Sequence, residues 1–123
     1  MTIDAFEAVV EEAVRAVPAH LQPYLETVQV VTDSVPNPGQ RRRMRLRDSG
    51  GLYGLYEGWT VPQRLHPDSS GLGPSVVTIF RIPLRRDFPD EAELIREIRH
   101  TVWHELAHHF GISDDALEAW GVY

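Results

Sequence analysis

TVWHELAHHFGISDD, residues 101–115, is the stretch from which the rest of the chain can be interpreted. Apolar side chains lead into it at helical spacing, one every three or four residues. They are Ile95, Ile98, Val102, Leu106 and Phe110. Asp90, preceded by a proline, is typical of a helix start, and Gly111 is typical of a helix end. The pattern therefore predicts one long helix from about Asp90 to His109.

The second half of this helix carries the sequence His-Glu-x-x-His at residues 104–108. Two imidazoles at positions i and i+4 lie one turn apart on one side of a helix, so His104 and His108 can bind one metal ion at about 2.0–2.1 Å. Glu105 then leans toward the coordination position that the histidines leave open. Val102 points about 200° away from His104, which leaves one face for the core and the other for a metal. The alternative is that both histidines lie on a solvated face without a ligand.

The motif continues as HExxHxxGxxD, with Gly111 three residues after His108 and Asp114 three residues after Gly111. A glycine at a helix end allows the chain to reverse, which can bring residue 114 back toward the histidines. A third protein ligand completes a catalytic zinc site that keeps one position open for water. We therefore expect Asp114 to be the third ligand, although an acidic residue there is also typical of the first turn of a following helix.

Four other polar side chains are considered for roles near the metal. His100 continues the spacing of the two histidines, but a fourth protein ligand would close the site, so we interpret it as a polar neighbour of the metal. His109 points elsewhere, and we expect it to form a hydrogen bond near the end of the helix. Tyr56, Arg64 and His109 are the side chains considered for stabilising a developing negative charge.

The remaining sequence predicts a helix followed by a small sheet. Apolar residues from Phe6 to Val17 repeat at helical spacing, and Pro18 stops that helix. Runs of β-branched, aromatic and apolar residues predict three strands, at residues 27–32, 52–58 and 75–84. Glycines make the second an edge strand where another backbone comes close, and apolar residues on both faces make the third central. A last short helix is expected from Asp114 to about Gly121.

The composition predicts a single domain over residues 1–123, because 42% hydrophobic and 24% charged residues are ordinary for a globular chain of this length. No cysteine is present, which excludes disulfides, thiolate catalysis and zinc sites built on cysteine. Charged residues interrupt the N-terminal segment, and no stretch approaches the length of a membrane span. We therefore expect a cytoplasmic protein with no membrane partner.

The net charge of −6 opposes binding to nucleic acid or to an anionic membrane. One basic segment stands out, with five arginines between Arg41 and Arg47. We expect residues 40–48 to form a solvated, mobile loop, because no aromatic residue accompanies the arginines as it does in many nucleic-acid contacts. The cluster could also recognise an acidic partner. Residues 59–74 are likewise expected to form a loop.

The stretch HELAHHFGISDD, residues 104–115, preceded by GLYEG at residues 54–58, resembles the small bacterial zincin-like metallopeptidases, or minimal zincins. The resemblance implies an α+β domain with an N-terminal helix, a small sheet of three or four strands, the long HExxH helix and a short C-terminal helix. It also implies Zn²⁺ held by His104, His108 and Asp114. The chain departs from the wider metzincin pattern, because residue 114 is Asp rather than His and the only methionines are Met1 and Met44.

The expected activity is hydrolysis of peptide bonds in a peptide or protein substrate, with zinc activating a water molecule and Glu105 acting as general base. A noncatalytic metal-binding or interaction module is the alternative. A metal-dependent ribonuclease is a further alternative, because one bacterial family uses a similar histidine spacing, but Glu105 and the acidic charge argue against it. The sequence leaves the oligomeric state open.

Overall fold

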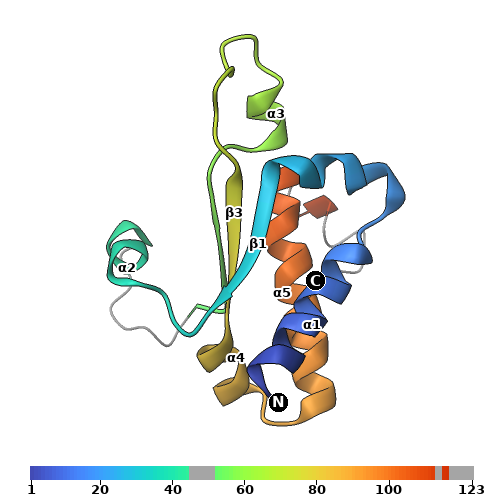
Figure 1. Cartoon of the computed structure of the whole chain (residues 1–123), viewed down its shortest axis with the longest axis vertical. Helices are drawn as coiled ribbons and strands as arrows, with labels where there is room; N and C mark the ends of the chain where they lie inside the picture. The colour runs from blue at the N-terminus through green and yellow to red at the C-terminus, as the bar shows by residue number, and fades with distance from the viewer. Residues whose placement is uncertain (45–51, 113–114, 117–123) are drawn as a thin grey trace.

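The computed structural model describes residues 1–44, 52–112 and 115–116. Two long helices, α1 (Ile3–Arg15) and α5 (Glu91–Phe110), lie side by side on one face of a three-stranded sheet (Figure 1). A 3₁₀ helix, η1 (Ala19–Thr27), leads from α1 into the first strand. The arrangement is the mixed α+β class that the sequence predicts.

Helix α1 begins at Ile3 and is capped by Thr2. The Thr2 side chain accepts a hydrogen bond from the backbone N–H of Ala5 at 3.0 Å, which satisfies one of the free donors of the first turn. The buried side chains Phe6, Val10 and Ala13 form one stripe. Trp103 of α5 donates from its indole nitrogen to the backbone oxygen of Ala13 at 2.8 Å, which ties the two long helices together.

The sheet has the strand order β1-β3-β2, with β1 at Val28–Asp33, β2 at Gly54–Glu57 and β3 at Ser75–Phe80. The central strand β3 pairs in parallel with β1 and antiparallel with β2. Both sequence predictions are confirmed, since β2 is an edge strand and β3 is central. Val77 and Ile79 of β3 are 0% exposed, as expected for a strand in the middle of the core.

The apolar stripe of α5 packs into this core, where Ile98, Val102 and Leu106 are 0% exposed. Leu94 is also buried, whereas Ile95, which the sequence places on the stripe, is only half-buried. The buried positions 94, 98, 102 and 106 follow a four-residue spacing, which leaves Ile95 at the edge of the apolar stripe.

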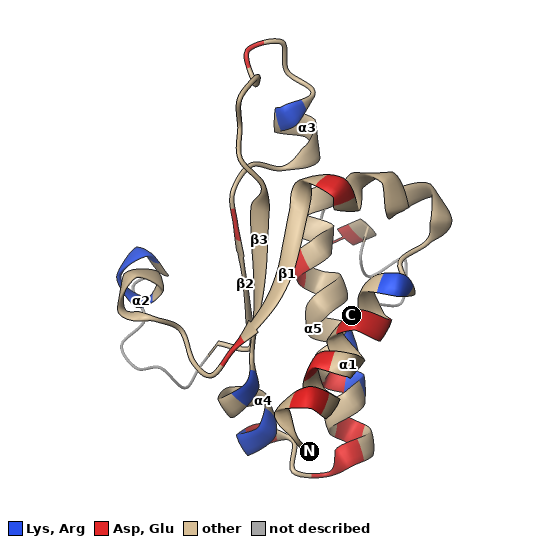
Figure 2. Ribbon diagram, in the orientation of Figure 1, with Lys and Arg blue, Asp and Glu red and all other residues tan. Residues whose placement is uncertain are grey.

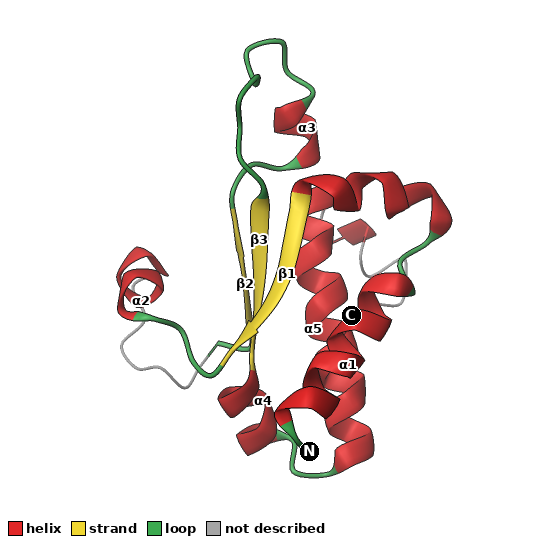
Figure 3. Cartoon of the chain, in the orientation of Figure 1, coloured by secondary structure: helices red, strands yellow, loops and turns green. Residues whose placement is uncertain are grey.

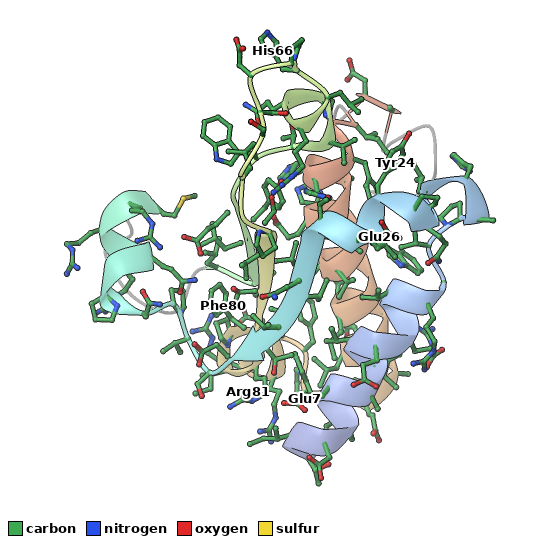
Figure 4. All side chains as sticks on the ribbon, turned by 45° about the horizontal axis from the view of Figure 1, so that its top comes forward. Glu7, Tyr24, Glu26, His66, Phe80 and Arg81 are labelled. Atoms are coloured by element: carbon green, nitrogen blue, oxygen red, sulfur yellow. The ribbon has the colours of Figure 1, made fainter. Side chains whose placement is uncertain are left out.

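The third strand is shorter than the sequence predicts. It ends at Phe80, and Arg81–Asp87 forms helix α4 instead of continuing the strand to Leu84. Figure 4 labels Phe80 and Arg81 at this junction. Pro83 falls in the first turn of α4, where a backbone N–H has no partner within the helix, while in a central strand it would remove a hydrogen bond of the ladder.

Two segments predicted as loops contain short helices. Helix α2 (Pro38–Met44) includes the first part of the arginine cluster, and helix α3 (Val61–Arg64) lies in the segment between β2 and β3 (Figure 3). Each helix begins with reciprocal bonds between a capping side chain and the residue three positions later, with a proline in the first turn. The capping pairs are Asn37 with Gln40 and Thr60 with Gln63.

The arginine cluster also has a structural partner. Arg43 pairs with the carboxylate of Glu57 on β2, and the Gln40 side chain donates to the same carboxylate at 2.9 Å. These contacts attach α2 to the edge strand. Figure 2 shows the basic residues of α2 in blue. Residues 45–48, the rest of the predicted mobile loop, lie outside the described residues.

The predicted C-terminal helix, Asp114 to about Gly121, lies outside the described residues except for residues 115 and 116. Among the helices that the structure does describe, none combines the length and the apolar character needed to cross a membrane.

Candidate metal centre

Helix α5 is bounded so that the HExxH motif occupies its last two turns. The Asp90 side chain accepts from the backbone N–H of Glu93 at 3.0 Å and caps the start. Gly111 ends the helix with φ of 76°, a left-handed conformation that glycine adopts at little cost. The backbone N–H of Ile112 donates back to the oxygen of Ala107 at 3.0 Å. The predicted helix and its C-terminal glycine are confirmed.

His104, Glu105 and His108 converge at this end of α5. One ligand atom from each lies within 4.8 Å of the others. The two imidazole rings are 4.8 Å apart between centroids and meet edge to face at 72°. The Glu105 carboxylate lies 3.3 Å from Nδ1 of His108, and its side chain is 12% exposed against 41% for His108. The carboxylate is therefore set deeper than the imidazole beside it.

This donor set fits a zinc ion. Zinc in proteins takes imidazole nitrogens and carboxylate oxygens, and a catalytic site has three protein ligands with one position open. The structure brings the two imidazoles close enough to bind one ion, with the Glu105 carboxylate beside them. Asp114, the predicted third ligand, lies outside the described residues.

The edge strand approaches the helix most closely at Gly54. A Cβ atom built on this residue would lie 2.7 Å from Cγ2 of Thr101 and 3.1 Å from Cγ of Glu105, closer than ordinary van der Waals contact. The sequence predicts that another backbone comes close to this strand, but at Gly54 the close neighbours are side chains of a helix. Strand β2 can lie this close to the motif because Gly54 has no side chain.

A cavity of about 350 Å³ opens between this strand and the helix. Its walls are residues 52–54 on one side and the half-buried flank of α5 from Glu97 to Glu105 on the other. His104 and Glu105 lie at one end of it, and His100, predicted to be a polar neighbour of the metal, lines the wall between them and Glu97.

The outer edge of β2 carries backbone groups directed away from β3. The backbone N–H of Phe80 donates to the oxygen of Tyr53 at 2.9 Å, which makes these two residues a hydrogen-bonded pair. Bonded and non-bonded pairs alternate along an antiparallel ladder, so Gly54 and Tyr56 direct their N–H and C=O groups to the outer edge. This edge runs beside the candidate metal centre.

His109 lies on the buried side of the same helix and is 0% exposed. One ring nitrogen, Nε2, lies 2.8 Å from the hydroxyl oxygen of Thr27, and Nδ1 lies 2.7 Å from the hydroxyl oxygen of Tyr56. Burial lowers the pKa of His109, and the positive charge of Arg64 lowers it further. The predicted hydrogen bond near the helix end is confirmed, with one partner at the end of η1 and the other in β2.

The side chains considered for stabilising negative charge are held in one internal network. The Tyr56 hydroxyl, besides His109, is within 3.0 Å of Oγ of Ser75 and 2.9 Å of the backbone oxygen of Trp59. Arg64 donates to the same two oxygens, at 2.9 Å to Ser75 and 3.0 Å to Trp59. Burial raises the pKa of the Tyr56 hydroxyl, so it stays protonated. These contacts give Tyr56, Arg64 and His109 a structural role.

Tyr56→Phe tests this network. Removing the hydroxyl leaves the imidazole of His109 and the Ser75 hydroxyl short of a partner, so we expect the free energy of unfolding to fall by roughly 1–3 kcal/mol. Denaturant unfolding monitored by circular dichroism measures the loss. Tyr53→Phe is the matched control on the same edge segment, because its hydroxyl bonds only the exposed carboxylate of Asp87 among the described residues. Equal losses for the two variants would contradict a special role for the buried network.

The comparisons with known proteins agree with this geometry. A family model described as zincin-like metallopeptidase matches residues 25–122, which include the whole sheet, α5 and the motif. The chain therefore belongs to the zincin-like metallopeptidase family. A search of curated proteins found no match.

Proposed function

We propose that this protein is a zinc-dependent metallopeptidase that hydrolyses peptide bonds. The observation that carries the proposal is the convergence of His104, Glu105 and His108 within 4.8 Å, beside a cavity and the outer edge of β2, with which no described strand pairs. Membership of the zincin-like metallopeptidase family supports the same activity.

In this mechanism His104, His108 and Asp114 hold the metal. Zinc bound there would supply a Lewis acid that polarises the scissile carbonyl and makes a neighbouring water more acidic. Glu105 takes a proton from that water and passes it to the nitrogen of the leaving amine. Its low exposure of 12% supports this role, because a carboxylate removed from bulk water interacts more strongly with nearby charge.

The substrate is proposed to bind as an additional strand. Gly54 and Tyr56 offer backbone donors and acceptors at the outer edge of β2, and an extended peptide can pair with such an edge. A peptide held there would pass over the close approach at Gly54, beneath which Glu105 lies. The peptide bond next to this contact is then the one that reaches Glu105.

The experiment combines metal analysis and cleavage on one preparation. The purified protein is analysed for metal content and incubated with a broad peptide library, whose products are read by mass spectrometry. We expect stoichiometric zinc and cleavage that stops when a chelator removes the metal and returns when zinc is added back. Metal without cleavage would favour a noncatalytic binding module, and cleavage that survives complete metal removal would contradict the proposal.

A further inference from the structure

The cavity beside the motif extends well beyond the groups that the proposed chemistry needs. It runs from His104 and Glu105 to Glu97, along one flank of α5. Glu97 precedes His104 by seven residues, which is about two helical turns and roughly 10 Å of axial rise. A side chain that enters the cavity near the motif must therefore be long to reach Glu97.

The far end of the cavity carries the carboxylate of Glu97. Glu97 is half-buried, and no arginine or histidine forms a salt bridge with it among the described residues. Asp87, which accepts a hydrogen bond from the Tyr53 hydroxyl, is paired with Arg86 at 2.8 Å. The bond from Arg86 and the hydroxyl of Tyr53 together lower the pKa of Asp87 to about 2, so it is ionised at neutral pH. The hydrogen bond to Asp87 and burial raise the pKa of the Tyr53 hydroxyl, and the negative charge of Glu97 raises it further.

The wall between the two ends suits an aliphatic stem. Tyr53 lines it with an aromatic ring whose centroid is 5.6 Å from that of Phe88, a packing contact that fixes the ring. Thr101 lines the opposite side, where its hydroxyl donates to the backbone oxygen of Glu97 at 2.7 Å and turns its methyl group toward β2. Lysine and arginine place their methylene groups along apolar surface, and their charge is attracted by an aromatic ring.

The alternatives fit less well. An acidic side chain would meet Glu97 at the far end and Glu105 near the entrance, both within the same cavity. A long apolar side chain would reach Glu97 and exclude water from its carboxylate without offering a donor, which costs free energy. A cation satisfies the carboxylate with a charge-assisted hydrogen bond.

We propose that this cavity is a specificity pocket that takes a lysine or arginine side chain from a substrate residue next to the scissile bond, with Glu97 as the group that pairs with its charge. The inference rests on the proposed peptidase function and adds the class of substrate to it. Glu97 contacts the substrate and takes no part in proton transfer.

A matched set of peptides tests the pocket. The peptides differ only at the residues flanking one cleavable bond, which are lysine, arginine, norleucine or glutamate, and kcat/KM is measured for each. We expect lysine and arginine peptides to be cleaved about tenfold better than the norleucine peptide, and the glutamate peptide to be cleaved worst. Glu97→Gln should remove the preference, and Glu97→Arg should transfer it to the glutamate peptide.

Glu93→Gln and Glu93→Arg are the matched controls, since Glu93 is exposed on the same helix one turn earlier and is not part of the cavity wall. They should leave the order of the peptides unchanged. Zinc content and circular dichroism establish that every variant is folded and loaded.

Peptide binding provides a second readout that does not need turnover. Fluorescence anisotropy with the Glu105→Gln protein should show about tenfold tighter binding of the lysine peptide than of the norleucine peptide, and Glu97→Arg in that background should reverse the order. If no peptide is cleaved by the zinc-loaded wild type but this order is observed, the proposed function fails and the pocket stands. If peptides are cleaved or bound without regard to the flanking charge, or if Glu97→Arg leaves the order unchanged, the pocket assignment is overturned.

Discussion

Glu105→Gln is expected to keep zinc and lose peptide hydrolysis. Glutamine preserves the size of the side chain and most of its hydrogen bonds, so the affinity for zinc should change by only a small factor. It cannot accept a proton as a carboxylate does, and general acid–base catalysis contributes about 10² to 10⁴ in rate. We therefore expect kcat to fall by at least that order while the KM for a verified peptide changes little.

Glu91→Gln is a suitable control, because this residue carries the same functional group at the exposed start of the same helix. It should retain the wild-type rate. A Glu105→Gln protein that cleaves at the wild-type rate would show that another group accepts the proton, and the mechanism proposed for Glu105 would be wrong.

His104→Ala and His108→Ala are each expected to reduce zinc content from stoichiometric to background. Each change removes one of the two imidazoles that converge with Glu105, and too few donors then remain to hold the ion. Asp114→Ala should weaken binding substantially, because it removes the proposed third ligand. Isothermal titration with zinc at constant pH measures all three, with the pH held because protons compete with the metal for the imidazole nitrogens.

His66→Ala is the control for these variants, since His66 is exposed in the segment between β2 and β3 and lies apart from the cluster. It should bind zinc as the wild type does. Zinc affinity unchanged by either motif substitution would place the ion elsewhere, and affinity unchanged by Asp114→Ala would limit that residue to capping a helix.

Local patterns in the sequence account for much of the fold. The bounds of α5 follow from its apolar spacing, a capping aspartate and Gly111, and the central position of β3 follows from apolar residues on both faces. Helix α4 was missed because the run Ile82–Leu84 is apolar enough for either a strand or a helix. Helices α2 and α3 have capping signals in the sequence but are too short to show a period.

Part of the candidate site can also be predicted from local sequence patterns, and part cannot. The spacing of the motif is sufficient to predict that His104, Glu105 and His108 converge, because all three are on one helix. The partners of His109 could not be predicted, since Thr27 is 82 residues away along the chain and Tyr56 is 53 residues away. Such contacts depend on how the strands pack against the helix, and no local pattern encodes that.

The anchoring of His109 has a thermodynamic consequence for the neighbouring His108. Because His109 is bonded to the end of η1 and to β2, the last turn of α5 is already fixed by the packing of the domain. Little conformational entropy therefore remains to be lost when a metal binds there. In zinc-finger domains the binding free energy drives folding itself, whereas here the core is assembled from apolar side chains, and the free energy of metal binding adds to the stability of a chain that is already folded.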